Sequence, residues 1–190
     1  MGRTAGRSPQ DTRRALLTAA GEAIRVRGIH ASLDEIARHA GVSKGGLIYH
    51  FASKDELILA LAHDLLATFR ASVDAALDPA DTAPGRLTRA YLRAVLVPPA
   101  DELAARESLA LITQLMTVPE VAALARADAQ RLEADLAADG LPPDVLTLVV
   151  AAADGMSSAP LWGGSYLTPE HQRLTRRLLD LTYRPTMWED

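Results

Sequence analysis

The sequence predicts an all-α protein, with a small helical module at the N-terminus and a larger helical body after it. Ala, Leu and Val supply most of the 48% hydrophobic residues, and only eight of the 190 residues are aromatic, a composition that favours helices over strands. Apolar residues recur every three or four positions over long stretches, as on the buried face of a helix. Helix caps, prolines and glycines separate these stretches.

Two short helices joined by a tight turn are expected near the N-terminus, after an amphipathic helix over residues 10–27. Ser32 and Glu35 have the Ser-x-x-Glu spacing of a capping box, which indicates where the first short helix begins. Gly41 stands where a left-handed residue ends a helix, and the second short helix covers Lys44–Phe51. Two helices joined by three or four residues that include a glycine form a helix-turn-helix, whose second helix enters the major groove of DNA.

The second short helix contains adjacent glycines, Gly45 and Gly46, which together cost roughly 2 kcal/mol relative to alanine. Such a cost is understandable where the backbone must approach a large partner closely, and the alternative is that the glycines form a loop. Hydrogen-bond donors are concentrated around them. These are Lys44, Tyr49, His50 and Lys54, and the two lysines are the only ones in the chain.

Three motifs in this region resemble those of the TetR/AcrR family of one-component transcriptional regulators. They are Gly41-Val42-Ser43-Lys44-Gly45, Tyr49-His50-Phe51 and Ser53-Lys54-Asp55-Glu56-Leu57, and the resemblance covers roughly a quarter of the chain. It implies a homodimer that binds a palindromic operator, with the last two long helices forming a four-helix interface with a second copy. It also implies a small-molecule effector bound among the middle helices of the C-terminal domain, and a repressor that the effector releases.

The residues expected to contact DNA fall into two groups. Groups suited to phosphate oxygens are those of Ser32, Ser43, Tyr49, His50 and Lys54. Base readout is expected from Lys44 towards a guanine, the backbone of Gly45 and Gly46, and Ile48 against a thymine methyl. Many family members carry Thr or Ser at the position of Gly46 and an aromatic residue at that of Ile48, so this chain lacks the usual hydroxyl and ring. Phe51 is expected in the core.

Charge is distributed unevenly along the chain. Residues 1–54 contain nine Lys or Arg against four acids, a net charge of +5, whereas the other 136 residues contain eleven Arg against twenty acids, a net charge of −9. This asymmetry indicates that the N-terminal end meets a polyanion, and the alternative is a solvated charged face. Arg3 and Arg7 belong to a basic arm that can reach a phosphate or the minor groove, or have no such role.

The body is expected to contain six further helices, and the domain division is 1–54 for DNA binding and 55–190 for effector binding and dimerisation. The expected helices cover about 53–77, 85–97, 101–116, 119–139, 144–159 and 169 onwards. The segment 144–159 is so apolar that it must be covered almost all round, partly by a second subunit. In the last helix Leu174, Leu178 and Leu181 make the apolar stripe.

Candidates for the effector pocket are aromatic, aliphatic and polar residues of the body, the usual composition of a small-molecule site. They are Phe69, Tyr91, Ile112, Met116, Met156 and Trp162, with Arg93, Gln114 and Asp154 as polar anchors. Ordinary core packing or surface exposure is the alternative for each of them.

Catalysis, metal binding and membrane insertion have no support in the sequence. The five histidines form no ligand pair, Gly155-Met156-Ser157-Ser158-Ala159 is not a nucleophile elbow, and there is no cysteine. Neither a secretory signal nor an apolar run of about 18 residues is present, so a soluble cytoplasmic protein without cofactor is expected. The remaining alternative is a dimeric helical interaction protein that has lost specific DNA binding. The operator, the effector and the regulated genes cannot be derived from the sequence.

Overall fold

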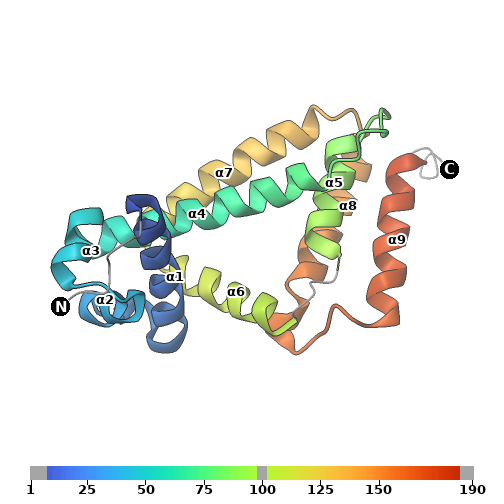
Figure 1. Cartoon of the computed structure of the whole chain (residues 1–190). Coiled ribbons are helices and arrows are strands. Elements are labelled where there is room, and N and C mark those ends of the chain that lie inside the picture. The colour runs from blue at the N-terminus through green and yellow to red at the C-terminus, as the bar shows by residue number, and fades with distance from the viewer. Residues whose placement is uncertain (1–7, 98–101, 185–190) are drawn as a thin grey trace. The chain divides into compact units, whose positions relative to one another are not determined.

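The computed structural model describes residues 8–97 and 102–184, and within these ranges the chain forms nine α-helices, two 3₁₀ turns and no strand (Figure 1). The all-α class is therefore confirmed. No single helix of the described ranges is long and apolar enough to cross a membrane, and only the bent pair α6–α7 meets the length and composition criteria together. The elements are α1 (Pro9–Arg27), η1 (Gly28–His30), α2 (Leu33–Ala40), α3 (Lys44–His50), α4 (Lys54–Ala75), α5 (Arg86–Leu96), α6 (Glu102–Leu115), α7 (Pro119–Ala137), α8 (Pro143–Ser157), η2 (Ala159–Trp162) and α9 (Pro169–Tyr183).

The chain divides into two compact units, and three of its helices contribute to both. The headpiece unit contains Met1–Leu66 and Ala110–Ala125, and the body unit contains Ala67–Leu109 and Arg126–Asp190. Helices α4, α6 and α7 each begin in one unit and end in the other. The functional division into 1–54 and 55–190 stays a prediction.

Local capping determines where the headpiece helices begin. The predicted capping box is confirmed, since Ser32 Oγ accepts the Glu35 N–H at 3.2 Å and a Glu35 carboxylate oxygen accepts the Ser32 N–H at 2.9 Å. These hydrogen bonds from the Ser32 backbone and hydroxyl hold the pKa of Glu35 below its usual value. Gly41 ends α2 with φ 72°, a left-handed conformation that glycine adopts without strain.

Ser53 and Glu56 have the Ser-x-x-Glu spacing of a second capping box, but the start of α4 is capped differently. Ser53 Oγ accepts the Glu56 N–H at 3.0 Å, but the Glu56 carboxylate accepts the N–H of Ala52 at 2.8 Å rather than that of Ser53. The preceding residue, Phe51, is extended, with φ −142°. The N–H groups of Ala52 and Glu56 are thus both satisfied at this helix start.

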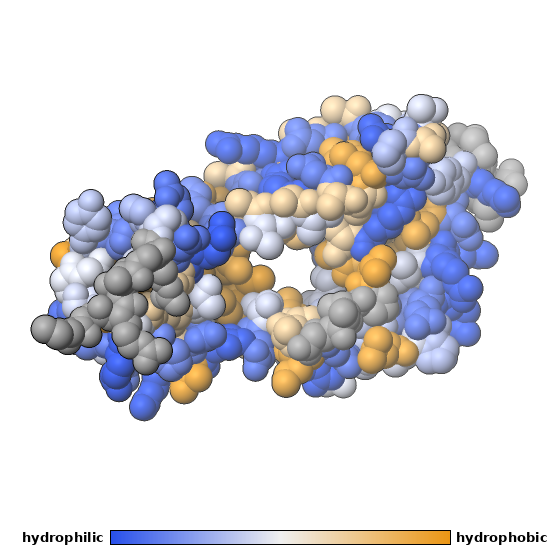
Figure 2. Space-filling view, in the orientation of Figure 1, coloured by the Kyte–Doolittle hydropathy of each residue, from blue (hydrophilic) through white to orange (hydrophobic). Residues whose placement is uncertain are grey.

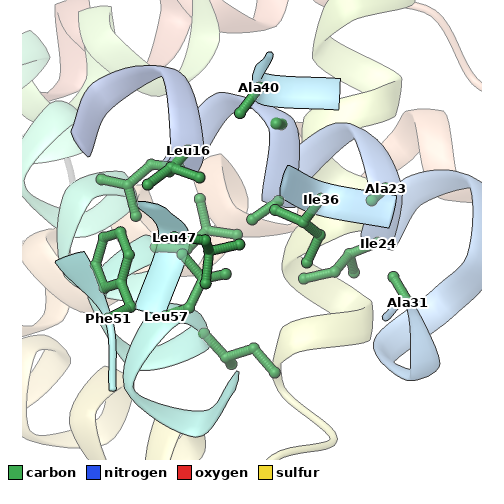
Figure 3. Packing of buried hydrophobic residues seen from close by; sticks show 14 of the residues in the cluster. Leu16, Ala23, Ile24, Ala31, Ile36, Ala40, Leu47, Phe51 and Leu57 are labelled. Carbon is green, nitrogen blue, oxygen red and sulfur yellow. The ribbon is translucent and has the colours of Figure 1, made fainter. Parts of the chain in front are cut away.

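The headpiece core is formed by apolar side chains from all of its helices. Figure 3 shows Leu16 and Ile24 of α1, Ile36 of α2, Leu47 of α3 and Leu57 of α4 directed into one interior. All five are fully or almost fully buried, as is Phe51, so the prediction that Phe51 belongs to the core is confirmed. Leu111, Leu115 and Val121 complete the same cluster. This packing holds the short helix α3 against two longer ones.

The core of the body unit lies among α5, α8, α9 and the end of α4. Helix α8 buries Val145, Val149 and Ala153 but leaves Leu148 38% exposed, with Ala151 exposed beside it. The single chain therefore does not cover this helix all round. An apolar residue on the open face of such a helix leaves a surface on which another chain can pack.

The buried face of α9 coincides only in part with the expected leucine stripe. Only Leu178 of the expected leucine stripe is fully buried, whereas Leu174 is 50% exposed and Leu181 half-buried. The buried face carries His171, Thr175, Leu178 and Thr182. These polar groups are buried because they find partners: a His171 ring nitrogen lies 2.9 Å from the Leu96 carbonyl oxygen, and Thr175 donates to the His171 carbonyl.

The outer face of α9 is basic and polar. Arg173, Arg176 and Arg177 are exposed, and Figure 2 shows an almost entirely hydrophilic surface over this helix in that view.

A fully buried arginine, Arg89, joins the segment before α5 to the end of α9. Its guanidinium binds both carboxylate oxygens of Asp81, at 2.6 and 2.7 Å, and lies 4.2 Å from the centre of the Tyr183 ring. It also donates to the carbonyls of Ala83 and Pro84. The hydrogen bonds from the Arg89 guanidinium to the Asp81 carboxylate hold the pKa of Asp81 below its usual value, because they stabilise the charged form. No sequence pattern indicated this cluster.

Candidate nucleic-acid interface

Helix α3 presents one polar face to solvent and anchors the other in the core. Leu47 is buried on the inner side, and Phe51 follows directly after the helix. The exposed residues are Lys44, Gly45, Ile48 and Tyr49, and 83% of Tyr49 is accessible. Exposure of a large aromatic side chain and an isoleucine on so short a helix indicates a surface for contact with a partner.

Neither backbone conformation nor lack of space requires glycine at position 45 of α3. Neither Gly45 nor Gly46 has a positive φ. A Cβ at Gly45 would meet nothing closer than Ser43 Oγ at 3.9 Å, and one at Gly46 would lie 3.4 Å from the same atom. Packing and backbone conformation therefore tolerate a side chain at Gly45. A glycine at this position leaves the backbone open to close approach from outside the chain.

The N-terminal end of α3 is fixed by two residues. Ser43 Oγ accepts the Gly46 N–H at 3.0 Å and so caps the helix. Lys44 Nζ lies 2.8 Å from a carboxylate oxygen of Asp34 in α2, and both side chains are exposed. Asp34 therefore holds the ammonium group that sequence analysis assigned to base readout. Asp34 could not be recognised from the sequence, because a separation of ten residues across a turn has no recognisable pattern.

The other predicted DNA contacts lie on α3 and at the starts of α2 and α4. The rings of Tyr49 and His50 meet edge to face, with centroids 5.2 Å apart. Lys54 is half-buried at the first position of α4, and Ser32 is exposed at the start of α2, where its hydroxyl bonds to Glu35. The structure thus brings all nine predicted residues to the α2–α3 segment and the start of α4. The expected basic arm with Arg3 and Arg7 lies outside the described residues.

Three of the residues predicted for an effector pocket meet in the body unit. The Phe69 and Tyr91 rings are arranged edge to face with centroids 6.2 Å apart, and the Tyr91 hydroxyl donates to the Asp154 carboxylate. Burial, followed by the hydrogen bond to Asp154, raises the pKa of Tyr91. Met156 packs against the same hydrophobic cluster, and half-buried Arg93 donates to the Ala76 carbonyl at 3.4 Å.

The other pocket candidates lie elsewhere. Ile112, Gln114 and Met116 belong to the headpiece unit and are exposed, and Trp162 of η2 is 85% exposed. Helix α6 buries only Leu111 and Leu115, although it carries apolar residues on two faces. The pocket assignment itself stays a prediction for all nine residues. Across the described ranges, no three His, Asp or Glu side chains are grouped to hold a metal ion.

An all-α chain with a helix-turn-helix headpiece and a separate helical body has the construction of a DNA-binding transcription regulator. Two family models match it. Residues 16–61 match bacterial regulatory proteins of the tetR family, and residues 85–183, more than half of the chain, match the tetracyclin repressor-like C-terminal domain. The chain belongs to the tetR family of transcription regulators, which are not enzymes.

Individual relatives agree with this assignment. The HTH-type transcriptional activator FasR of Mycolicibacterium smegmatis is 54% identical over 61 residues, which are 31% of this chain and 28% of FasR. A transcriptional regulator from Rhodococcus sp. Rha1 has the same fold, with 22% identity, a TM-score of 0.69 and coverage of 91% of this chain and 96% of that one. The multidrug binding protein EbrR in complex with malachite green gives 25% identity, a TM-score of 0.67 and coverage of 90% and 97%.

Proposed function

We propose that this regulator binds a pseudo-palindromic operator as a homodimer, acts in the cytoplasm as a repressor, and is released by a small-molecule effector. The observation that carries the proposal is the exposed face of α3, where Lys44, Ile48 and Tyr49 surround a glycine that the chain itself does not require. The +5 charge of residues 1–54 supports a polyanionic partner at this end.

The dimer is proposed to form through α8 and α9, as in other members of the family. The exposed face of α8 with Leu148 and Ala151 supports this proposal, because an apolar helix face is stabilised by a second chain. A two-fold symmetric dimer binds a symmetric site. Its two α3 helices, the reading helices, are then about 34–36 Å apart or a multiple of that spacing.

An effector is proposed to bind beside the group formed by Phe69, Tyr91 and Asp154. Two aromatic rings next to a carboxylate provide apolar contact together with a polar anchor, and EbrR, which has a similar fold, binds malachite green. Helix α4 carries Phe69 and contributes to both units, so the effector can act on DNA affinity through it. A ligand that favours one spacing of the reading helices shifts the population of binding-competent dimers.

The sign of regulation is proposed from the family name, while the similarity to the activator FasR is confined to a short stretch of the chain. A reading helix can hold DNA in either role, and the position of the operator relative to the promoter decides the outcome. In vitro transcription from a promoter that carries the recovered operator, with and without the protein, distinguishes repression from activation.

Selection of bound duplexes from a random pool tests the proposal. We expect a motif with two-fold symmetry and half-sites separated by about one helical turn or a multiple of it. Failure to enrich any motif at low salt would contradict operator binding and favour a helical interaction protein. Ligands that raise the melting temperature are then screened for an effect on affinity for the recovered duplex. If none changes that affinity, the effector mechanism fails.

A further inference from the structure

We propose that Arg13 of α1 is a positioning residue for α3: it holds the C-terminal end of this helix and thereby sets how α3 meets the bases. The inference rests on the proposed DNA binding of α3. It assigns Arg13 a role inside the protein, although an exposed arginine on a DNA-binding module would ordinarily be taken as a phosphate contact.

Two contacts of the same guanidinium carry the inference. Arg13 Nη1 donates to the carbonyl oxygen of His50, the last residue of α3, at 3.3 Å. The guanidinium carbon also lies 4.2 Å from the centre of the Phe51 ring, a cation–π distance. Thirty-seven residues separate Arg13 from His50, so the contacts connect two helices. One side chain thus binds both the end of α3 and the residue that follows it.

Helix α3 needs such support because it is weak by itself. It has only seven residues and contains Gly45 and Gly46, whereas isolated helices shorter than about 12–15 residues are marginal even with good helix formers. Ser43 and Asp34 fix its N-terminal end.

At the other end, the last carbonyls of a helix have no intrahelical donor. A cationic side chain there supplies a hydrogen bond and interacts favourably with the negative end of the helix dipole. Arg13 provides both, so α3 is held at its two ends by side chains of its own headpiece.

The neighbouring Arg14 supplies a matched control. It is exposed on the same helix and has the same charge, and within the described residues its guanidinium makes none of the contacts that Arg13 makes. Lysine is the informative replacement at both positions. It keeps the charge, but its ammonium lacks the planar fork that donates to a carbonyl while stacking on a ring.

The first experiment needs no DNA. Amide hydrogen exchange of the full-length chain is compared for wild type, Arg13→Lys and Arg14→Lys. We expect exchange in peptides covering 44–51 to accelerate about ten-fold in Arg13→Lys only, because lysine cannot bond the His50 carbonyl and lie over the Phe51 ring at the same time. Peptides from α1 and α5 report whether the variant is otherwise folded. Unchanged exchange in 44–51 would overturn the inference.

The second experiment measures affinity for a duplex selected by the wild-type protein and for a scrambled duplex, over a series of salt concentrations. Arg13→Lys should lose about ten-fold in affinity for the selected duplex, with little change for the scrambled one and an unchanged salt slope. Arg14→Lys should prefer the selected duplex over the scrambled one to the same extent as the wild type.

Arg13→Ala is then measured on both duplexes. If it weakens binding to both equally and lowers the salt slope by about one, Arg13 is a phosphate contact and the inference is wrong. If the wild type does not discriminate between the duplexes, operator binding has failed, and hydrogen exchange alone decides whether Arg13 holds α3.

Discussion

Lys44 shows how one side chain can serve two states of the protein. In the free chain its ammonium lies 2.8 Å from Asp34, and both groups are exposed, so the pair contributes only about 0.2–1 kcal/mol to stability. A pair this weak can exchange for a contact with a guanine at little cost. Lys54 is half-buried at the start of α4, and it is the residue we expect to contact the phosphate backbone.

Replacement of the two lysines should therefore have different consequences. Lys44→Ala is expected to weaken DNA binding and relax the sequence preference, whereas Lys54→Ala should weaken binding to all duplexes alike and lower the salt slope by about one. Competition binding with selected and random duplexes measures both effects. Equal losses on the two duplexes from Lys44→Ala would remove this residue from base readout.

At the scale of elements, the two glycines of α3 lower the stability of this short helix and leave its backbone accessible. Gly45→Ala should stabilise the chain by up to about 1 kcal/mol, since its φ is not positive and the added Cβ meets nothing closer than 3.9 Å. The same methyl group should weaken DNA binding if the backbone approaches the groove closely. Urea unfolding and duplex affinity are measured together. Unimpaired affinity in a stabilised variant would contradict the close approach.

The Arg89–Asp81 pair is the element-scale feature with a defined pH dependence. The pKa of Asp81 is lower in the folded chain than its usual 3.8, so the stabilisation is complete above that value and is lost as pH falls through the folded-state pKa. Asp81→Asn leaves Arg89 buried without its counter-charge, which costs about 3–5 kcal/mol at neutral pH.

Urea midpoints measured from neutral pH to below about pH 4 test this expectation. The control is Asp78→Asn, a change in the same segment at an exposed carboxylate that accepts the Ala80 N–H at 2.9 Å. Asp78→Asn should lower the free energy of unfolding by less than about 1 kcal/mol, and its loss of stability at acid pH should follow the same curve as that of the wild type. Similar losses from both variants would mean that the buried pair is not the cause.

Elements governed by local chemistry could be predicted from the sequence, and those governed by distant partners could not. Ser32, Glu35 and Gly41 act within one or two helical turns, and the structure confirms them. The inward face of α9 could not be derived from the sequence. His171 is buried there because its ring finds a hydrogen-bond partner in the carbonyl of Leu96, 75 residues away. The same holds for the site: the α3 contacts form one contiguous segment, whereas Arg13 and Asp34 act on it from other helices.

At the scale of the whole molecule, the proposed dimer is the feature that turns one reading helix into an operator-binding protein. Leu148→Glu places a charge on the open face of α8 and should shift the chain to monomers, with a corresponding loss of operator affinity. Ala123→Glu on the exposed surface of α7 is the control and should remain dimeric. Sedimentation velocity gives the oligomeric state. A Leu148→Glu protein that stays dimeric would place the interface elsewhere.

The most direct test of the central claim is the salt dependence of duplex binding by the purified wild-type chain, with the stoichiometry measured alongside. If two cationic headpieces together contact about six to ten phosphates, affinity should fall roughly 10³- to 10⁵-fold between about 50 and 200 mM salt, with two chains bound per duplex. A chain that remains monomeric and binds no duplex at low ionic strength would contradict the account.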